Sequence, residues 1–270
     1  MIELPEAMTI AMQMNYELKG KKIEYGNRGN SPHKFAFYNH SPEEYENIFK
    51  DKTIGESRGF GSLILTCLEP DHFLILGGGG ERILFHQSEE TLPKKYQLLL
   101  QFKDDTYLTV TVQGWGFNQI KHQSEIGSEG VSPISDAFTF EYFQILFNDL
   151  KEGDPRSAKF FIISKPGIWG VGNGYLQDIL FRAKIHPRRR IIGLADYEKS
   201  SLYEAIKYTI KQAIDMNGRD DEKDLYGNFG GYKRILNSRT NGTPCSECGA
   251  IIEKISFLGG ASYFCPKCQV

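Results

Sequence analysis

Apolar residues at helical spacing mark the beginning of the chain. Residues 5–18 are predicted to form a helix, because Pro5 suits the first helical position and Glu6 complements the positive end of the helix dipole. Gly20 ends the apolar run. The pattern predicts that four side chains line the buried face of this helix: Met8, Ala11, Met12 and Tyr16.

Short β-type segments broken by turns follow, from residue 22 to about residue 112. Six strands are predicted there: Lys34–Tyr38, Ser62–Leu68, His72–Leu76, Arg82–His86, Tyr96–Phe102 and Thr106–Val112. A run of strands after one helix is typical of a β-sandwich. We therefore expect an α+β fold that begins with a helix and a sandwich.

Helical patterns return in the second half of the chain. Residues 121–135 are rich in Ser, Gly and Glu and are predicted to form a linker or exposed loop. Helices are predicted at residues 135–150 and 196–217, with another apolar segment at 158–164 between them.

A glycine-containing turn precedes a further helical pattern that ends at Pro187. Asn173 sits where a helix N-cap belongs, and Gly170 and Gly172 let the backbone come close to a ligand. Backbone N–H groups at a helix N-terminus form a natural seat for an anion, which in nucleic acids is a phosphate. A turn between two packed helices has the same spacing, so the spacing alone leaves both interpretations open.

Four cysteines near the end of the chain form two C-x-x-C pairs. Cys245 and Cys248 are separated by sixteen residues from Cys265 and Cys268, which is the spacing of a four-thiolate structural zinc site. Two disulfides or a redox pair are the alternatives. No signal peptide is visible, so we expect a reducing compartment, which disfavours disulfides. Cys67 lies in an apolar strand and is predicted to be a buried thiol that is not a ligand.

Charge is distributed unevenly along the chain. Residues 1–150 carry 13 Lys and Arg against 21 Asp and Glu, whereas residues 151–270 carry 19 against 13. The basic second half is therefore the predicted nucleic-acid face. No apolar run approaches the length that spans a bilayer, so we expect no membrane partner and a cytoplasmic protein.

Several of these motifs occur together in one family. The Gly-Val-Gly-Asn turn, the Phe-Arg-Ala-x-Ile-His-Pro ending of its helix, the Cys-containing C-terminal hairpin and the opening Glu-Leu-Pro-Glu resemble the formamidopyrimidine-DNA glycosylase / endonuclease VIII family of base-excision repair. The resemblance implies a β-sandwich domain (1–125), a helical domain with a helix–two-turn–helix motif (132–236) and a zinc-finger β-hairpin (237–270). It also implies one structural zinc ion and a monomer that binds damaged or distorted DNA, expected to be double-stranded, at the nucleoid if the cell is bacterial.

The resemblance also implies a catalytic site at the N-terminus. In the family, the N-terminal amine attacks C1′ of the sugar and forms a Schiff base. The family's usual proline is replaced by Ile2, so the amine is that of Ile2 after processing or that of Met1. Glu3 falls on the family's acid, although a carboxylate there could also serve only the helix dipole. Met1, Ile2, Glu3 and Glu6 are the candidate catalytic residues.

Three other family residues are replaced, which makes the chain a divergent member. The strand-leading lysine falls near Phe60, the methionine wedge falls in Gly77–Gly80, and the arginine of the zinc-finger tip falls at Gly260. A glycine supplies neither a phosphate contact nor a wedge. The resemblance therefore implies a glycosylase with AP-lyase activity on oxidised bases or, because of these replacements, a catalytically silent DNA-binding protein as the alternative.

The candidate DNA contacts are of two kinds. The turn of Gly170, Gly172 and Asn173, aided by Lys165 and Arg239, is predicted to hold backbone phosphate. Trp115 and Phe117 fall near the family loop that probes the opposite strand, where an aromatic ring can insert between bases. A core aromatic at the end of a strand is the alternative for these two residues.

Overall fold

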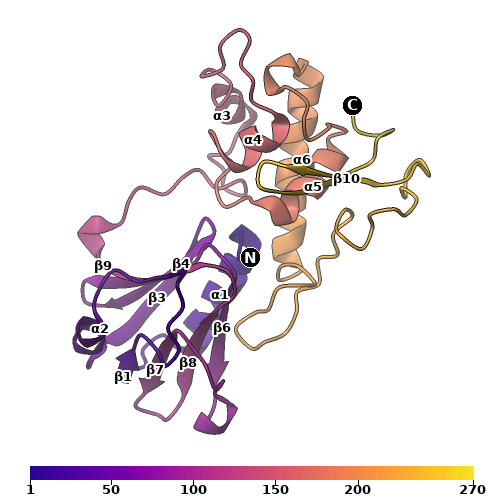
Figure 1. Ribbon diagram of the computed structural model, residues 1–270. Helices are drawn as coiled ribbons and strands as arrows, with labels where there is room; N and C mark the ends of the chain where they lie inside the picture. Colours follow the sequence, from indigo (N-terminus) through magenta and orange to yellow (C-terminus); the bar gives the residue numbers. More distant parts are fainter. The chain divides into compact units, whose positions relative to one another are not determined.

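The computed structural model describes residues 1–270 and divides them into two compact units (Figure 1). The first unit contains residues 1–129 and 216–231, and the second contains residues 130–215 and 232–270. The sequence instead predicts that residues 216–231 belong to the helical domain and that the zinc finger forms a third domain.

The segment 216–231 joins the first unit through hydrogen bonds to its helix and one of its sheets. Gln13 Nε2 donates to Asp224 Oδ2 (2.9 Å), and the Leu225 amide donates to Gln13 Oε1 (2.9 Å). The Phe85 amide donates to the Leu225 carbonyl (2.9 Å), and the Leu225 side chain is buried in the core. The polar composition of this segment gives no sign of these long-range contacts.

Two sheets and one long helix, α1 (Leu4–Glu17), build the first unit (Figure 1). The five-stranded sheet has the order β2 (Ala36–Phe37), β9 (Gly116–His122), β5 (His72–Gly77), β4 (Leu63–Glu69), β3 (Thr53–Phe60). The four-stranded sheet has the order β1 (Ile23–Asn27), β7 (Leu98–Phe102), β8 (Tyr107–Val112), β6 (Glu81–His86). All pairs are antiparallel except β2 and β9. The predicted α+β fold with a β-sandwich is confirmed.

One apolar core lies between the sheets and α1. It includes Leu74 and Ile120 from the first sheet, Leu100 and Val110 from the second, and Ile10 from α1, all at most 1% exposed. Each such side chain contributes roughly 1.5–3 kcal/mol through burial.

The buried face of α1 differs from the prediction. Met12 and Tyr16 are exposed, and the buried stripe is formed by Ala7, Ile10, Ala11 and Met14. These four lie at i, i+3, i+4 and i+7, the spacing of one helical face. Of the predicted side chains, Ala11 is buried and Met8 is half-buried. The prediction favoured bulky side chains and therefore did not include the small Ala7 at the start of the stripe.

Four elements of the first unit were not predicted: β1, β3, β9 and the helix α2 (Pro42–Phe49). α2 begins with a capping box, in which the Glu44 amide donates to Ser41 Oγ (3.2 Å) and the Ser41 amide donates to Glu44 Oε2 (2.7 Å). Two short 3₁₀ turns, Glu89–Thr91 and Gln123–Glu125, complete the unit.

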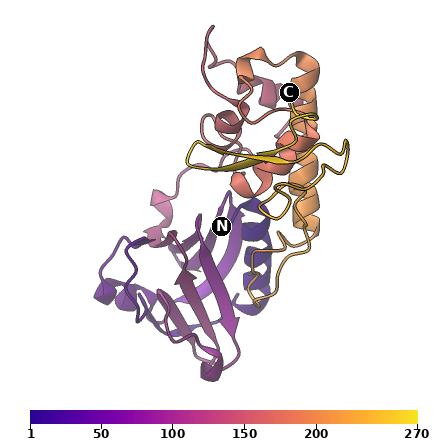
Figure 2. The same cartoon turned by 45° about the vertical axis from the view of Figure 1, so that its right-hand side comes forward.

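The second unit is helical and carries a β-hairpin (Figure 2). Its helices are α3 (Phe140–Ile145), α4 (Ala158–Ile163), α5 (Asn173–Arg182) and α6 (Asp196–Asp215), with a 3₁₀ turn at Ile191–Gly193. α5 packs against α4 and α6, and the hairpin strand β11 (Gly260–Phe264), paired with β10 (Glu253–Phe257), also contacts α5. No helix is long and apolar enough to cross a membrane.

α3 is shorter than the predicted helix at 135–150. It begins only at the N-cap Thr139, whose side chain accepts from the Tyr142 amide (3.1 Å). After Ile145 the chain continues in i→i−3 turns, such as the bond from the Asn148 amide to the Ile145 carbonyl (3.0 Å).

Candidate N-terminal site and nucleic-acid interface

The N-terminus of the chain is anchored at its first two residues. The Ile2 side chain is buried in the core, and its amide donates to the Gly79 carbonyl (2.9 Å). The Met1 amine forms an ion pair with Glu222, while the Met1 side chain remains about half exposed. The nitrogen of Ile2 is thus an amide inside the structure, and the Met1 amine is the group at the surface.

A buried arginine, Arg219, organises the carboxylates around this amine. Its Nη1 lies 3.3 Å from Glu3 Oε1 and 3.7 Å from Glu6 Oε2, and its Nη2 lies 3.3 Å from Glu222 Oε1. Nη2 also donates to the Met1 carbonyl. Because a buried charge is costly unless it is paired, these carboxylates are required partners of the guanidinium.

Glu3 and Glu6 also start the first helix. The Glu3 amide donates to Glu6 Oε2 (3.0 Å), and the Glu3 side chain completes the capping box at the third helical residue. The Arg219 amide donates to Glu6 Oε1 (3.0 Å). Both interpretations of Glu3 thus have a structural counterpart, since it caps the helix and lies beside the N-terminus. Sequence reasoning missed Arg219 and Glu222, whose only signal was a run of charges in a polar segment.

Another carboxylate, Glu81, lies beneath the glycine loop of residues 77–80. Its Oε1 accepts from the Gly77 amide (3.1 Å) and its Oε2 accepts from the Gly79 amide (3.2 Å). Burial raises the pKa of Glu81 to about 8, although these amides and the positive N-terminus oppose the rise.

Trp115 and Phe117 lie beside this loop. The Gly80 amide donates to the Trp115 carbonyl (2.8 Å), and Phe117 lies on β9. Trp115 is 37% exposed and Phe117 is half-buried, so Trp115 is not a core residue.

In the second unit, the glycine turn leads into α5 as predicted. Gly170 has φ +72°, which favours glycine, and Gly172 is the N-cap residue. Asn173 is therefore the first helical residue and not the cap. Its side chain instead lies beside the tip of the zinc-finger hairpin, where a Cβ placed on Gly260 would be 3.8 Å from Asn173 Nδ2.

Lys159 lies behind the same hairpin tip. Its Nζ donates to the Phe257 carbonyl (2.7 Å) and to Ser262 Oγ (3.1 Å), and burial lowers its pKa. A Cβ on Gly260 would lie 3.7 Å from this ammonium group. Sequence reasoning missed Lys159, because a single lysine in an apolar segment carries no distinguishing signal.

α5 also fixes the chain that approaches the zinc finger. Gln177 Nε2 donates to the Ala261 carbonyl (3.1 Å), and its Oε1 accepts from the Tyr263 amide (3.2 Å). Buried Asp178 accepts from the amides of Ile235 and Leu236, each at 2.9 Å. The hairpin is therefore held at a defined place on the helix that carries the turn.

The two remaining candidate phosphate ligands are exposed. Lys165 lies in the loop that precedes the turn, and Arg239 lies in the approach to the zinc finger. The Arg239 amide donates to Asn237 Oδ1 (2.7 Å), which fixes the backbone of that approach.

The four candidate zinc ligands converge at the end of the second unit. Their Sγ atoms all lie within 4.8 Å of one another, with 3.9 Å between Cys245 and Cys268 and 3.4 Å between Cys248 and Cys265. Zn–S bonds of about 2.3 Å in a tetrahedron place sulfurs about 3.8 Å apart. The site fits one structural zinc ion, as predicted. The fifth cysteine, Cys67, lies on β4 and is half-buried, so it is less buried than predicted.

Two family models match separate segments of the chain, and curated proteins match it along its whole length. The family model of the formamidopyrimidine-DNA glycosylase H2TH domain matches residues 130–223, and that of the zinc finger found in FPG and IleRS matches residues 242–270. The formamidopyrimidine-DNA glycosylase of Cytobacillus firmus is 29% identical, with each chain covered completely. The corresponding protein of Bacillus subtilis is 28% identical over all of this chain and 99% of its own.

Solved structures show the same fold. The Lactococcus lactis Fpg, in complex with an abasic site containing DNA, superposes with a TM-score of 0.83 at 22% identity, covering 99% of each chain. MutM (Fpg) from Thermus thermophilus gives a TM-score of 0.82 at 22% identity, covering 99% of this chain and 98% of its own.

The fold and the cysteine site together define a DNA-glycosylase-like protein with a helix–two-turn–helix domain and a zinc finger. Over its whole length the chain is similar to formamidopyrimidine-DNA glycosylases, and it carries their H2TH domain and the zinc finger found in FPG and IleRS. The resemblance found in the sequence is confirmed.

The zinc site gives the first testable prediction. Purified protein should contain about one equivalent of zinc, and chelation should unfold the hairpin before the rest, because metal binding there contributes folding free energy. Cys265→Ser should lose the zinc, whereas the matched change Cys67→Ser should retain it. Metal analysis and circular dichroism during chelator titration measure both effects. Less than roughly half an equivalent in fresh wild-type protein would contradict the site.

Glu81 gives a prediction for pH. Its pKa rises from 4.5 to about 8 on folding, so between these values the folded state binds more protons than the unfolded state. The contribution of Glu81 should therefore lower the free energy of unfolding as pH rises between these two pKa values. The decrease should be at most about 1.4 kcal/mol per pH unit. Urea unfolding from pH 4.5 to 8 should show a shallower fall for Glu81→Gln. Exposed Glu56→Gln is the control, and an unchanged slope in Glu81→Gln would refute the assignment.

Proposed function

We propose that this protein binds damaged double-stranded DNA and cleaves the strand at the lesion, with the Met1 amine as its nucleophile. The observation that carries the proposal is the surface amine of Met1, paired with Glu222 beside Glu3, Glu6 and buried Arg219. Relatives named formamidopyrimidine-DNA glycosylase and a neighbour solved with abasic-site DNA support the same substrate class.

Met1, and not Ile2, is the proposed nucleophile. The Ile2 side chain is buried and its nitrogen is engaged with Gly79, whereas Glu222 contacts the Met1 amine and Arg219 contacts the Met1 carbonyl. A bulky second residue also hinders removal of the methionine.

The proposed reaction at an abasic site needs only this amine and proton transfer. The neutral amine adds to the C1′ aldehyde of the ring-opened sugar, and loss of water gives an imine. Removal of a C2′ proton then breaks the C3′–O bond, which cuts the strand. At an oxidised base, the amine first displaces the base from C1′, and the base leaves with a proton. Glu222 contacts the amine and can accept its proton, and Glu3 is the proposed acid or base at the sugar.

The second unit is proposed to hold the DNA backbone. The turn at Gly170 and Gly172 directs the positive end of the α5 dipole outward, and Asn173 lies beside the hairpin tip. Exposed Lys165 and Arg239 add positive charge in the basic half of the chain. Trp115 and Phe117 are the proposed rings that enter the base stack.

A protein that repairs DNA must act where the DNA is. We propose a monomer that acts in the cytoplasm, at the nucleoid of a bacterial cell.

The chain lacks several groups that position the nucleotide in the family it resembles. Glycines occupy positions 77–80 and 260, and position 60 is not a lysine. Catalysis is therefore expected to be slow, since a misplaced reactant costs ~100-fold.

Borohydride trapping on abasic-site and oxidised-base duplexes tests the activity. A covalent adduct should map to Met1, and Glu222→Gln and Glu3→Gln should each lower its yield, because each removes a group that transfers protons. Exposed Glu204→Gln on α6 is the matched control. No adduct on any substrate, with tight binding retained, would instead establish a catalytically silent DNA-binding protein.

Two substitutions at the phosphate site should differ in their salt dependence. Lys165→Ala should reduce the slope of log K against log salt by about 1, because one cation no longer displaces a counterion. Asn173→Ala should weaken binding similarly on all sequences without changing the slope, because the amide is neutral. Fluorescence-anisotropy titrations from low to high salt measure both. Exposed Asn148→Ala is the control, and wild-type affinity in both variants would contradict the site.

A further inference from the structure

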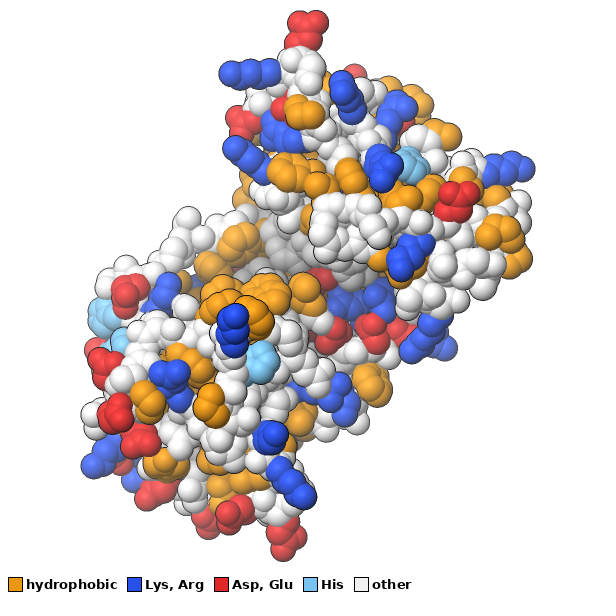
Figure 3. Space-filling view, in the orientation of Figure 1, with side chains coloured by type: hydrophobic (Ala, Val, Ile, Leu, Met, Phe, Trp, Pro, Cys, Tyr) orange, Lys and Arg blue, Asp and Glu red, His pale blue; other side chains and the backbone are white.

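An exposed aromatic patch lies on the first unit. We define it by Phe35, Phe37, Trp115 and Phe117. The ring of Phe37 lies 6.3 Å from that of Trp115 and 5.7 Å from that of Phe117, and Trp115 and Phe117 are 5.8 Å apart. Phe35 is 47% exposed and Phe37 is 40% exposed. Figure 3 shows apolar side chains gathered on one face of this unit.

Several large aromatic rings lie side by side at the surface of this unit. A contiguous exposed apolar patch of this kind indicates a binding surface. β2 is the edge strand of the five-stranded sheet and pairs with β9, which places Phe37 directly beside Phe117. The Gly116 amide donates to the Phe35 carbonyl (3.0 Å), which fixes the backbone between the two phenylalanines. The patch is thus built across two paired strands and does not arise from one loose side chain.

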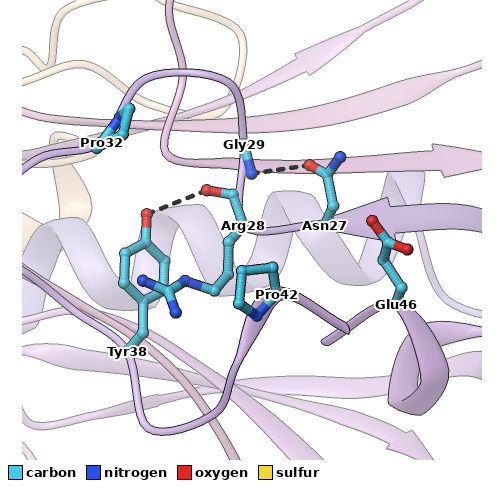
Figure 4. A pocket seen from close by; sticks show the side chains of 7 residues that line it. All are labelled: Asn27, Arg28, Gly29, Pro32, Tyr38, Pro42 and Glu46. Atoms are coloured by element: carbon cyan, nitrogen blue, oxygen red, sulfur yellow. Dashed lines mark hydrogen bonds between the residues drawn. The ribbon is translucent and has the colours of Figure 1, made fainter. Parts of the chain in front are cut away.

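The loop that carries Phe35 and Phe37 is held at both ends (Figure 4). The Arg28 guanidinium lies over the Tyr38 ring, 4.0 Å from its centroid, beside a cavity of about 250 Å³. Tyr38 donates to the carbonyls of Gln97 (2.6 Å) and Arg28 (3.2 Å), and Arg28 Nη1 donates to the His40 carbonyl (3.0 Å). This clamp orders the loop before any ligand binds, which lowers the entropy cost of binding.

The patch is continuous with the N-terminal site through the glycine loop. The Gly80 amide bonds to the Trp115 carbonyl, and the Gly79 carbonyl bonds to the Ile2 amide. A Cβ on Gly78 would lie 3.1 Å from the Phe117 ring, so glycine allows the loop to pack closely under the rings. A nucleotide at the Met1 amine would therefore have neighbours within reach of these rings.

A cation accompanies the rings. Lys34 is exposed, and its Nζ lies 5.4 Å from the centroid of the Phe35 ring. Exposed aromatic rings with a nearby cation are the combination that binds single-stranded nucleic acid, since bases stack on the rings and phosphates meet the charge. A paired base offers no free face to such a patch.

We infer that the aromatic patch stacks unpaired bases next to the lesion, so that the protein prefers damaged duplexes with a short unpaired tract over fully paired ones. The inference rests on the proposed function and adds a substrate class to it. Phe35 and Phe37 enlarge the stacking surface that Trp115 and Phe117 form, so that more than one base can stack on the patch.

Tryptophan fluorescence reads this contact directly. The chain has two tryptophans, so Trp169→Phe leaves Trp115 as the reporter, and Trp115→Phe assigns the signal if the first variant folds poorly. An abasic duplex with a five-base thymine bubble should quench Trp115 more strongly than the same duplex fully paired, because more bases are free to stack on the patch. Quenching of equal size by both duplexes would overturn the inference.

Affinity provides the second measurement. Phe37→Ala should lower affinity for the bubble duplex by ~5- to 100-fold, the loss of one stacked base, and reduce the preference over the paired duplex. Phe37→Trp should restore the preference, whereas Phe37→Leu should not, because it keeps the apolar volume without the ring. Tyr197→Ala, an exposed aromatic on α6, is the control. An unchanged preference in Phe37→Ala would contradict the patch.

Borohydride trapping on the same samples separates the two proposals. Quenching and bubble preference without a Met1 adduct would support the patch and contradict strand cleavage. A Met1 adduct with no preference for the bubble would support strand cleavage and contradict the patch.

Discussion

A buried guanidinium needs carboxylates around it, and this requirement at Arg219 determines the architecture of the N-terminal site. Glu3 and Glu6 approach it from the start of α1, and Glu222 approaches from the segment 216–231. The same carboxylates cap α1, so the beginning of the helix and the neutralisation of the charge depend on one another. Removing one partner of a buried pair typically costs about 3–5 kcal/mol, which ties the two ends of the first unit's chain into one structural unit.

In the second unit, hydrogen bonds from one helix connect segments that are distant in sequence. α5 carries the glycine turn at its beginning, and Gln177 and Asp178 on its buried face hold the hairpin and the approach to the zinc finger. Lys159 from α4 fixes the hairpin tip from behind. The metal therefore shapes only the finger, while the helix determines where the finger lies relative to the turn.

Local patterns predicted much of the fold. Pro5 with Gly20, the alternating strands, and the paired cysteines each depend on neighbours in sequence, and each has a counterpart in the structure. The features that sequence reasoning missed depend on long-range contacts. Arg219 looked like part of a solvated charge run, Lys159 looked like a stray charge in an apolar segment, and Phe37 gave no sign that it would lie beside Phe117. Asn173 was assigned as the N-cap, but Gly172 serves as the N-cap and the helix begins at Asn173.

The ion pair at Met1 has a practical consequence for producing the protein. A tag or a single additional residue ahead of Met1 would convert its amine into an amide, which carries no charge and cannot form an imine. Glu222 would then keep Arg219 as its partner but lose the amine. Preparations with an N-terminal fusion would thus lack the amine that is proposed to react with the sugar.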